Sequence, residues 1–278
     1  MAIVMRKLIR PQVNFYLRNL SSQTKLVEVE QRDSGIAVVS MNRAPVNSLN
    51  LELLTELTTT LNDVKKQKAK GIIITSSLAT VFSAGLDIME MYKTNVDRCT
   101  KFWNALQDYW MTLYGLEIRT AAAINGASPA GGCLTAIACE YRVIVGGKNM
   151  IGLNETKLGI VAPQWFKENY ISTIGYRKAE LALLRGTLFT PEEALNINLV
   201  DELASNKDDA IAKCEKYINS FDKIPAEAVG VTKLQLRNNL ISWLKNNRQK
   251  DTEIFVNFVT SPKVQAGLEM YLQSLKKK

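Results

Sequence analysis

Residues 125–139 read NGASPAGGCLTAIAC and place a glycine-rich turn directly before an apolar helix. Gly131 and Gly132 fall at the start of that helix, where the first backbone N–H groups have no partner inside the helix. The helix dipole adds positive potential at the same end, and a residue without a side chain lets a bound group approach the backbone closely. The stretch therefore predicts a strand-to-helix transition whose N–H groups stabilise an anion or a developing oxyanion.

Two further segments have a related character. Residues 82–88 (FSAGLDI) form a second small-residue loop upstream, and Asn154-Glu155-Thr156 places a carboxylate just downstream. Either glycine loop alone is explained equally well by tight turns and close helix packing. Two such loops, each at a predicted strand-to-helix transition and followed by a candidate base, favour a site with two donor loops and one carboxylate.

The spacing of apolar residues around these loops predicts alternating strands and helices. Strands are expected at 25–30, 35–41, 71–75, 120–125 and 141–145, and helices at 51–66 and 97–114. The first two strands form a hairpin, and the strand–helix–strand order then predicts right-handed crossovers onto a mostly parallel sheet. From Pro163 onward the pattern is helical, with a capped helix start at Thr190 and helices at 208–221, 225–246, 250–259 and 262–275.

The length and composition are those of an ordinary globular protein. The 278 residues suffice for one large α/β domain, or for a smaller domain with an appendage, and no linker-like run divides them. Hydrophobic residues make up 46% and charged residues 22%, which excludes a disordered or fibrous chain. We therefore expect a sizeable core.

The net charge of +8 comes largely from the two ends of the chain. The body between them is nearly balanced and shows no basic stripe with aromatic residues, so no nucleic-acid partner is expected. Residues 1–20 combine Arg and Lys with apolar residues and contain no acid, a composition typical of a mitochondrial transit peptide. A basic, unstructured N-terminus is the alternative. No apolar run approaches the roughly 20 residues of a membrane span, so we expect a soluble protein of the mitochondrial matrix.

The chain contains four cysteines and no histidine. No two cysteines have CxxC spacing, and Cys133 and Cys139 lie in the apolar helix, so all four are expected as free thiols. Without histidine, Ser-His-Asp and Cys-His catalytic arrangements are excluded and a metal site of the zinc type is not expected. Acid–base chemistry must therefore use Glu, Asp, Lys, Tyr or Cys, and Glu155 is the candidate.

VFSAGLDI, NGASPAGGC and LNETKLGIVAP resemble signature segments of the crotonase (enoyl-CoA hydratase/isomerase) superfamily, and the similarity runs from about residue 25 to the C-terminus. Within this superfamily, the three segments are most similar to those of the mitochondrial 3,2-trans-enoyl-CoA isomerases. The resemblance implies an α/β fold with a ββα spiral core and an all-α C-terminal segment that forms homotrimers. On this basis we expect the transit peptide in 1–20, the core in 21–200 and the oligomerisation segment in 201–278.

The resemblance also implies roles for single residues. The N–H groups of Leu86 and Gly131 would form the oxyanion hole, and Glu155 would be the catalytic base. The substrate-binding positions would be Ala84, Gly85, Leu86, Asp87, Ile88, Gly131 and Asn154. No cofactor is implied, because coenzyme A is part of the enoyl-CoA thioester substrate.

Hydratases of the superfamily use two glutamates, and the first corresponds to Leu134 in this chain. Since leucine cannot activate water, the single Glu155 favours a reaction with one shuttling base, the C-2 to C-4 proton transfer that turns a cis- or trans-3-enoyl-CoA into the trans-2-enoyl-CoA. That reaction would serve β-oxidation of unsaturated fatty acids. Apolar neighbours would raise the carboxyl pKa. The alternatives are a hydratase or other crotonase-type acyl-CoA enzyme, and a non-catalytic acyl-CoA-binding or RNA-associated protein.

Other residues have weaker cases. Asp87 is expected to cap the short helix that follows it, because Asp is favoured at such ends. Trp165 and Phe166 are candidates for lining an acyl groove, although an aromatic pair at a helix start is also typical of a core.

Overall fold

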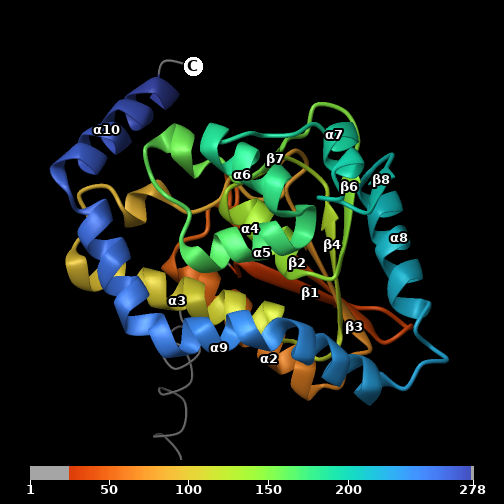
Figure 1. The fold of residues 1–278 in the computed structure, drawn as a ribbon. Coiled ribbons are helices and arrows are strands. Elements are labelled where there is room, and N and C mark those ends of the chain that lie inside the picture. The colour runs from red at the N-terminus through yellow and green to blue at the C-terminus, as the bar shows by residue number, and fades with distance from the viewer. Residues whose placement is uncertain (1–24, 277–278) are drawn as a thin grey trace, which may run out of the picture.

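Six strands form one mixed sheet at the centre of the molecule (Figure 1). The computed structural model describes residues 25–276, so the predicted transit peptide in residues 1–20 lies outside the described residues. In spatial order the strands are β1 (Val27–Gln31), β2 (Ile36–Met41), β3 (Gly71–Ser76), β4 (Arg119–Ile124), β6 (Tyr141–Val145) and β8 (Glu202–Ala204). β1 and β2 pair antiparallel and all the other neighbours in this sheet pair parallel, which confirms the predicted hairpin and the mostly parallel sheet.

The central strands are buried on both faces, as is typical of parallel strands covered by helices. Every residue of β3 and of β4 is buried. On one face, alternate strand residues such as Ile73 and Ala121 pack against α8 (Lys207–Asn219). On the other, Ile72, Ile74 and Ala122 belong to the larger core beneath α2 (Leu51–Lys66), α3 (Val96–Tyr114) and α4 (Gly131–Ala138). Because successive side chains of a strand point to opposite faces of the sheet, each strand contributes side chains to the core on both faces.

A second, two-stranded sheet brings distant segments of the chain together. β5 (Ser128–Pro129) pairs parallel with β7 (Ile151–Gly152), and the backbone N–H groups of Ser128 and Ala130 donate to the carbonyl oxygens of Met150 and Gly152. Only Ala130 separates β5 from α4, and only Leu153 and Asn154 separate β7 from Glu155. This short pairing therefore fixes the glycine-rich turn beside the candidate base.

The C-terminal helices largely follow the predicted pattern, with differences at two places. They are α5 (Gln164–Ile174), α6 (Tyr176–Arg185), α7 (Pro191–Asn196), α8, α9 (Ala226–Val259) and α10 (Pro262–Lys276). Thr190 forms a capping box with Glu193 at the start of α7, as expected. The two helices predicted at 225–246 and 250–259 are a single 34-residue helix, α9. The three-residue strand β8 lies in a stretch for which the sequence pattern predicted no strand.

Both differences have tertiary causes. α9 continues through its polar stretch because Arg248 pairs with Asp108 and Asp251 accepts hydrogen bonds from Trp103 and Gln107, all on α3. Three residues are too few for β8 to show an alternating pattern. α8 packs on the main sheet and α9 packs along α3. The division of the chain at residue 200 stays a prediction.

The four cysteines are buried free thiols, as expected. None of the helices within residues 25–276 combines the length and the apolar character that crossing a membrane requires.

Candidate active site

A small cavity of about 70 Å³ lies where the two predicted donor loops and the Glu155 segment meet. It is lined by five of the predicted site residues, namely Ala84, Leu86, Ile88, Asn154 and Glu155. The first three belong to the loop that leads into the 3₁₀ turn η1 (Ile88–Glu90), and the last two to the start of the 3₁₀ turn η2 (Glu155–Leu158). The fold thus gathers segments that are about 70 residues apart in the sequence.

The first donor is the backbone N–H of Leu86. Its loop lies beside Leu49, whose N–H donates to the carbonyl of Gly85 (2.8 Å) and whose carbonyl accepts from the N–H of Asp87 (3.0 Å). In an extended segment successive N–H groups point to opposite sides. Within residues 25–276 no hydrogen bond of the Leu86 N–H is found, and Leu86 lines the cavity, so this N–H points away from Leu49 and stays available to a ligand.

The second donor is the N–H of Gly131, the first residue of α4. α4 has no side-chain cap, and its preceding residue Ala130 has φ 49°, an uncommon value for a residue with a side chain. A Cβ atom at Gly131 would lie 3.2 Å from the Leu86 nitrogen and 3.0 Å from Leu49 Cδ1. The N–H groups of Leu86 and Gly131, neither of which has a hydrogen-bond partner in the described residues, are therefore neighbours, and a Cβ atom at position 131 would crowd the Leu86 nitrogen.

The other glycines of these loops serve close packing. Gly85 has φ +88°, and a Cβ atom there would lie 3.0 Å from the carbonyl oxygen of Pro129. A Cβ atom at Gly132 would lie 2.5 Å from the carbonyl oxygen of Ser83. The packing explanation of the glycines therefore holds for these two positions, and the close packing is what brings the two donors side by side.

Glu155 is a buried carboxylate without a partner. Its side chain is 5% exposed, and within the described residues neither oxygen makes a hydrogen bond. Burial raises the pKa of the carboxyl from 4.5 to about 7, opposed by its own backbone N–H. Ile151 and Leu153, shortly before it in the chain, are also buried. A carboxyl with a pKa near neutrality can both accept and return a proton, as a shuttling base must.

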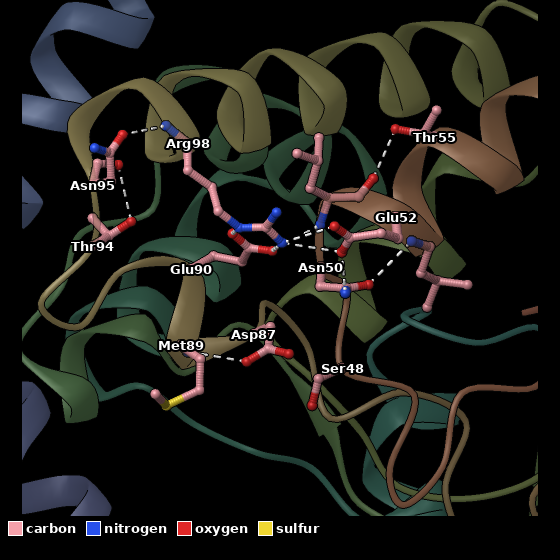
Figure 2. Close-up of polar contacts among 12 residues, drawn as sticks. Ser48, Asn50, Glu52, Thr55, Asp87, Met89, Glu90, Thr94, Asn95 and Arg98 are labelled. Carbon is pink, nitrogen blue, oxygen red and sulfur yellow. Dashed lines mark hydrogen bonds and ion pairs between the residues drawn. The ribbon is translucent and has the colours of Figure 1, made fainter.

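Asp87 stabilises the first donor loop. Its carboxylate caps η1 by accepting from the N–H of Met89 at 3.0 Å (Figure 2). It also pairs with Arg43 Nη2 at 2.9 Å. The expected capping role is confirmed. A contact between Asp87 and substrate stays a prediction.

Glu90 holds the same loop from its other end. Its buried carboxylate accepts from the backbone N–H of Leu51 (3.1 Å) and from Nε and Nη2 of Arg98 (2.9 and 2.6 Å). Arg98 also pairs with Glu52 at 2.9 Å (Figure 2). Because Leu51 begins α2 and Arg98 lies in the first turn of α3, Glu90 ties η1 to both helices.

The sequence analysis missed the remaining residues that line the cavity. They are Met91, Pro129, Ala130, Ile160, Leu268 and Tyr271, whereas Leu158, which also lines the cavity, is one of the apolar neighbours expected around Glu155. Leu268 and Tyr271 belong to α10, which is held over η1 by Gln265. The Oε1 of Gln265 accepts from the N–H of Lys93 (2.8 Å), and its Nε2 donates to the carbonyl of Met91 (2.9 Å). The amphipathic pattern of α10 predicts a buried face but contains no sign of what that face covers.

Trp165 and Phe166 do not line this cavity. Both are fully buried in the core, where the Trp165 indole N–H donates to Asp251. The groove-lining prediction is therefore wrong for this site, and the core alternative is confirmed. Among residues 25–276, no group of three or more Cys, Asp or Glu side chains is placed to hold a metal ion.

Comparisons with known proteins identify the family to which the chain belongs. The model of the family described as enoyl-CoA hydratase/isomerase matches residues 31–278. The chain is 43% identical over 263 residues to the rat protein named enoyl-CoA delta isomerase 1, mitochondrial, an alignment that covers 94% of this chain and 90% of the relative. The human protein of the same name is 41% identical, covering 93% and 86%.

Solved structures give the same result. The crystal structure of human mitochondrial delta3-delta2-enoyl-CoA isomerase matches with a TM-score of 0.88 and 41% identity, covering 91% of this chain and 98% of that one. An enoyl-CoA hydratase from Bacillus halodurans matches with a TM-score of 0.80, covering 88% and 99%, but at 23% identity it shows the fold alone. The chain belongs to the enoyl-CoA hydratase/isomerase family.

Proposed function

We propose that this protein is an isomerase that converts a cis- or trans-3-enoyl-CoA into the trans-2-enoyl-CoA. One observation carries the proposal: Glu155, a buried carboxylate without a hydrogen-bond partner in the described residues, shares its cavity with Leu86, whose backbone N–H has no hydrogen-bond partner in the same residues. The relatives of highest identity named above are enoyl-CoA delta isomerases, and they support the same reaction. The substrate-binding roles of Ala84, Gly85, Leu86, Asp87, Ile88, Gly131 and Asn154 are part of this proposal.

The two backbone donors would hold the thioester. Its carbonyl oxygen accepts hydrogen bonds from the N–H groups of Leu86 and Gly131, and the negative charge that forms on this oxygen strengthens both. In other enzymes, removing one such donor costs about 2.7–4 kcal/mol of barrier. Because both donors belong to rigid backbone, they need no reorganisation as the charge develops.

Glu155 would move the proton. Its carboxylate takes a proton from C-2 of the 3-enoyl chain, and the electron pair of that C–H bond delocalises into a dienolate whose charge rests on the thioester oxygen. The protonated Glu155 then gives the same proton to C-4, and the double bond comes to lie between C-2 and C-3. General-base action of this kind contributes about 100- to 10,000-fold to the rate.

The hydratase alternative lacks the second carboxylate among the described residues that line the cavity. The position that carries a glutamate in hydratases is Leu134, whose side chain is 1% exposed and belongs to the core. Glu155 is the carboxylate among the described residues that line the cavity, and Leu134 does not line it. An attacking water molecule would therefore meet one carboxylate where hydratases supply two.

We also propose that the protein acts in the mitochondrial matrix, in β-oxidation of unsaturated fatty acids, and as a homotrimer. The composition of residues 1–20 and the mitochondrial relatives support the compartment. Exposed apolar side chains on the C-terminal helices, among them Leu236, Ile254 and Met270, support association with further copies. A mass of one subunit in light scattering would contradict the trimer.

The deciding experiment follows absorbance while the protein turns over a 3-enoyl-CoA and, in parallel, a 2-enoyl-CoA. We expect conjugation to appear with the 3-enoyl substrate and no fast hydration of the 2-enoyl substrate. Hydration at a rate comparable to isomerisation would favour the hydratase. Binding of either thioester without turnover would favour a non-catalytic acyl-CoA-binding protein.

A further inference from the structure

The helix that supplies the second oxyanion donor has little local support. α4 has eight residues, begins with Gly131 and Gly132, and has no side-chain cap at its N-terminus. Isolated helices shorter than about 12 residues are marginal in water, and glycine disfavours the helix further. The contacts that fix α4, and with it the N–H of Gly131, must therefore come from the rest of the fold.

Arg237 of α9 makes such a contact at the C-terminal end of α4. Its Nη1 donates to the carbonyl oxygen of Ala138, the last residue of α4, at 3.0 Å. The same nitrogen donates at 2.9 Å to the carbonyl oxygen of Tyr114, the last residue of α3. The guanidinium also lies over the Tyr114 ring, 4.3 Å from its centroid. One side chain therefore joins α9 to the C-terminal ends of both α3 and α4.

The charge of Arg237 is not paired with a carboxylate within residues 25–276, unlike those of two cations nearby. Arg142, shortly after α4, pairs with Asp201 at 3.1 Å. Lys233, one turn earlier on α9, pairs with Glu140 at 2.5 Å. A guanidinium stays protonated in proteins. Arg237 therefore places a positive charge at the negative end of the α4 dipole, where cations are favourable.

The two ends of α4 are close enough for this charge to act on the donor. Eight residues at a rise of 1.5 Å per residue span about 12 Å. Every residue of α4 is buried, so water screens the interaction along the helix only weakly. The charge of Arg237 therefore adds to the positive potential that the helix dipole supplies at the N–H of Gly131.

We propose that Arg237 is a positioning residue for the oxyanion hole: it anchors the C-terminal end of α4 and adds positive potential along this helix, so that the N–H of Gly131 stabilises a charged oxygen better. The proposal rests on the proposed function for the identity of that oxygen, the carbonyl oxygen of the thioester. At about 15 Å and an effective dielectric constant of about 20, the charge alone corresponds to about a 6-fold change in rate.

The test is Arg237→Met in the full chain, which removes the charge and keeps an apolar side chain. The infrared C=O stretch of bound butanoyl-CoA, labelled with ¹³C at the carbonyl, measures how strongly the donors polarise that bond. We expect the stretch to lie at a higher frequency in Arg237→Met than in the original protein. With a 3-enoyl-CoA, kcat should fall about 6-fold while KM changes less than 2-fold, because the oxygen carries its full charge only in the transition state.

Arg248→Met is the matched control. Arg248 lies on the same helix and also holds α9 to α3, through the carbonyl of Asn104 at 3.1 Å and the carboxylate of Asp108 at 2.7 Å. We expect this variant to leave the C=O stretch unchanged. Arg237→Lys keeps the charge and should restore most of the original stretch. Citrulline in place of Arg237 keeps the planar shape without the charge, so it keeps the proposal testable if Arg237→Met fails to fold.

Three results would overturn the proposal. They are an unchanged C=O stretch in folded Arg237→Met or in the citrulline variant, an equal shift in Arg248→Met, and a shift in Arg237→Lys as large as that in Arg237→Met. Butanoyl-CoA has no double bond to move, so the shift can be measured even if no isomerisation occurs. Failure of this proposal and failure of the proposed function are therefore distinguishable.

Discussion

Glu90 and Glu155 are both buried glutamates next to a donor loop, yet their surroundings differ. Glu90 is 3% exposed and Glu155 is 5% exposed. The carboxylate of Glu90 accepts three hydrogen bonds, one from Leu51 and two from Arg98, whereas that of Glu155 accepts none in the described residues. Glu90 is held between two helix starts, and Glu155 faces a cavity.

Burial alone therefore does not mark a functional carboxylate. The charge of Glu90 is compensated by Arg98, so protonating Glu90 would break contacts that hold the loop. Glu155 has no such partner to lose, and burial raises its pKa to about 7. A group that must change its charge during a reaction is best left without a fixed countercharge, whereas a group that holds a loop needs one.

The largest effect is expected on activity, from Glu155→Gln. The amide has nearly the same shape but cannot accept the C-2 proton, so kcat should fall by about 100- to 10,000-fold. Steady-state turnover of a 3-enoyl-CoA measures it. Thioester binding should be retained, because the two backbone donors are untouched. Activity within a few-fold of the original protein would show that Glu155 is not the base.

The next effect is on the pH dependence of the protein's stability, to which Glu155 contributes because its carboxyl group is buried without a partner in the described residues. Its pKa is raised to about 7 in the folded protein from 4.5. The folded state thus binds the proton more tightly, so the contribution of Glu155 to stability is fully present below about pH 4.5 and is lost as pH rises to about 7. A shift of this size corresponds to about 3 kcal/mol.

Urea unfolding between pH 4.5 and 8, compared with Glu155→Gln, measures this contribution. The free energy of unfolding of the original protein should fall relative to the variant as pH rises, while its kcat rises over the same range because more of Glu155 is ionised. If the free energy of unfolding changes with pH in the same way for both proteins, the Glu155 carboxyl is exposed to water in the folded protein.

Gly131→Ala tests the donors around Glu155 while leaving both glutamates in place. The new Cβ atom would lie 3.2 Å from the Leu86 nitrogen, in the space before the two N–H groups. We expect kcat to fall by about 100-fold, near the loss of one oxyanion donor. Gly146→Ala is the control, since a Cβ atom there meets Ala204 O at an ordinary 3.7 Å. An equal fall of kcat in the two variants would show that Gly131 does not act as an oxyanion donor.

The comparison of the two glutamates also shows how far the sequence could lead. Residues 71–75 form a continuous apolar run, so periodicity and length predicted β3, and Thr190-Pro191 predicted the start of α7. The glycine loops and Glu155 could be selected because their residue types are unusual at such places. Glu90 could not be assigned a role in this way, because its partners Leu51 and Arg98 are brought to it only by the fold.

The residues that the sequence analysis missed are defined by long-range contacts. Leu268 and Tyr271 lie more than 100 residues after Glu155, and their place in the cavity depends on how Gln265 attaches α10 to η1. The continuity of α9 depends in the same way on Asp251 and Arg248 meeting α3. Local patterns predict that a helix has a buried face, but tertiary packing decides what that face meets.

The smallest effect is expected from Glu90→Gln, and it falls on stability. The amide keeps the volume but loses the charge that Arg98 pairs with, and one of its two terminal atoms becomes a donor facing other donors. Arg98 is 46% exposed, so water compensates part of the loss. We expect about 1–2 kcal/mol lower stability in urea unfolding, with kcat within a few-fold.

Glu52→Gln is the matched control for this prediction. Glu52 pairs with the same Arg98 at 2.9 Å but is 51% exposed (Figure 2), and exposed pairs contribute little. Its stability should therefore stay within about 0.5 kcal/mol of the original protein. If Glu52→Gln lowers the free energy of unfolding as much as Glu90→Gln does, the buried contacts of Glu90 are not what holds the loop. The contrast between the two glutamates would then rest only on Glu155 having no charged partner in the described residues.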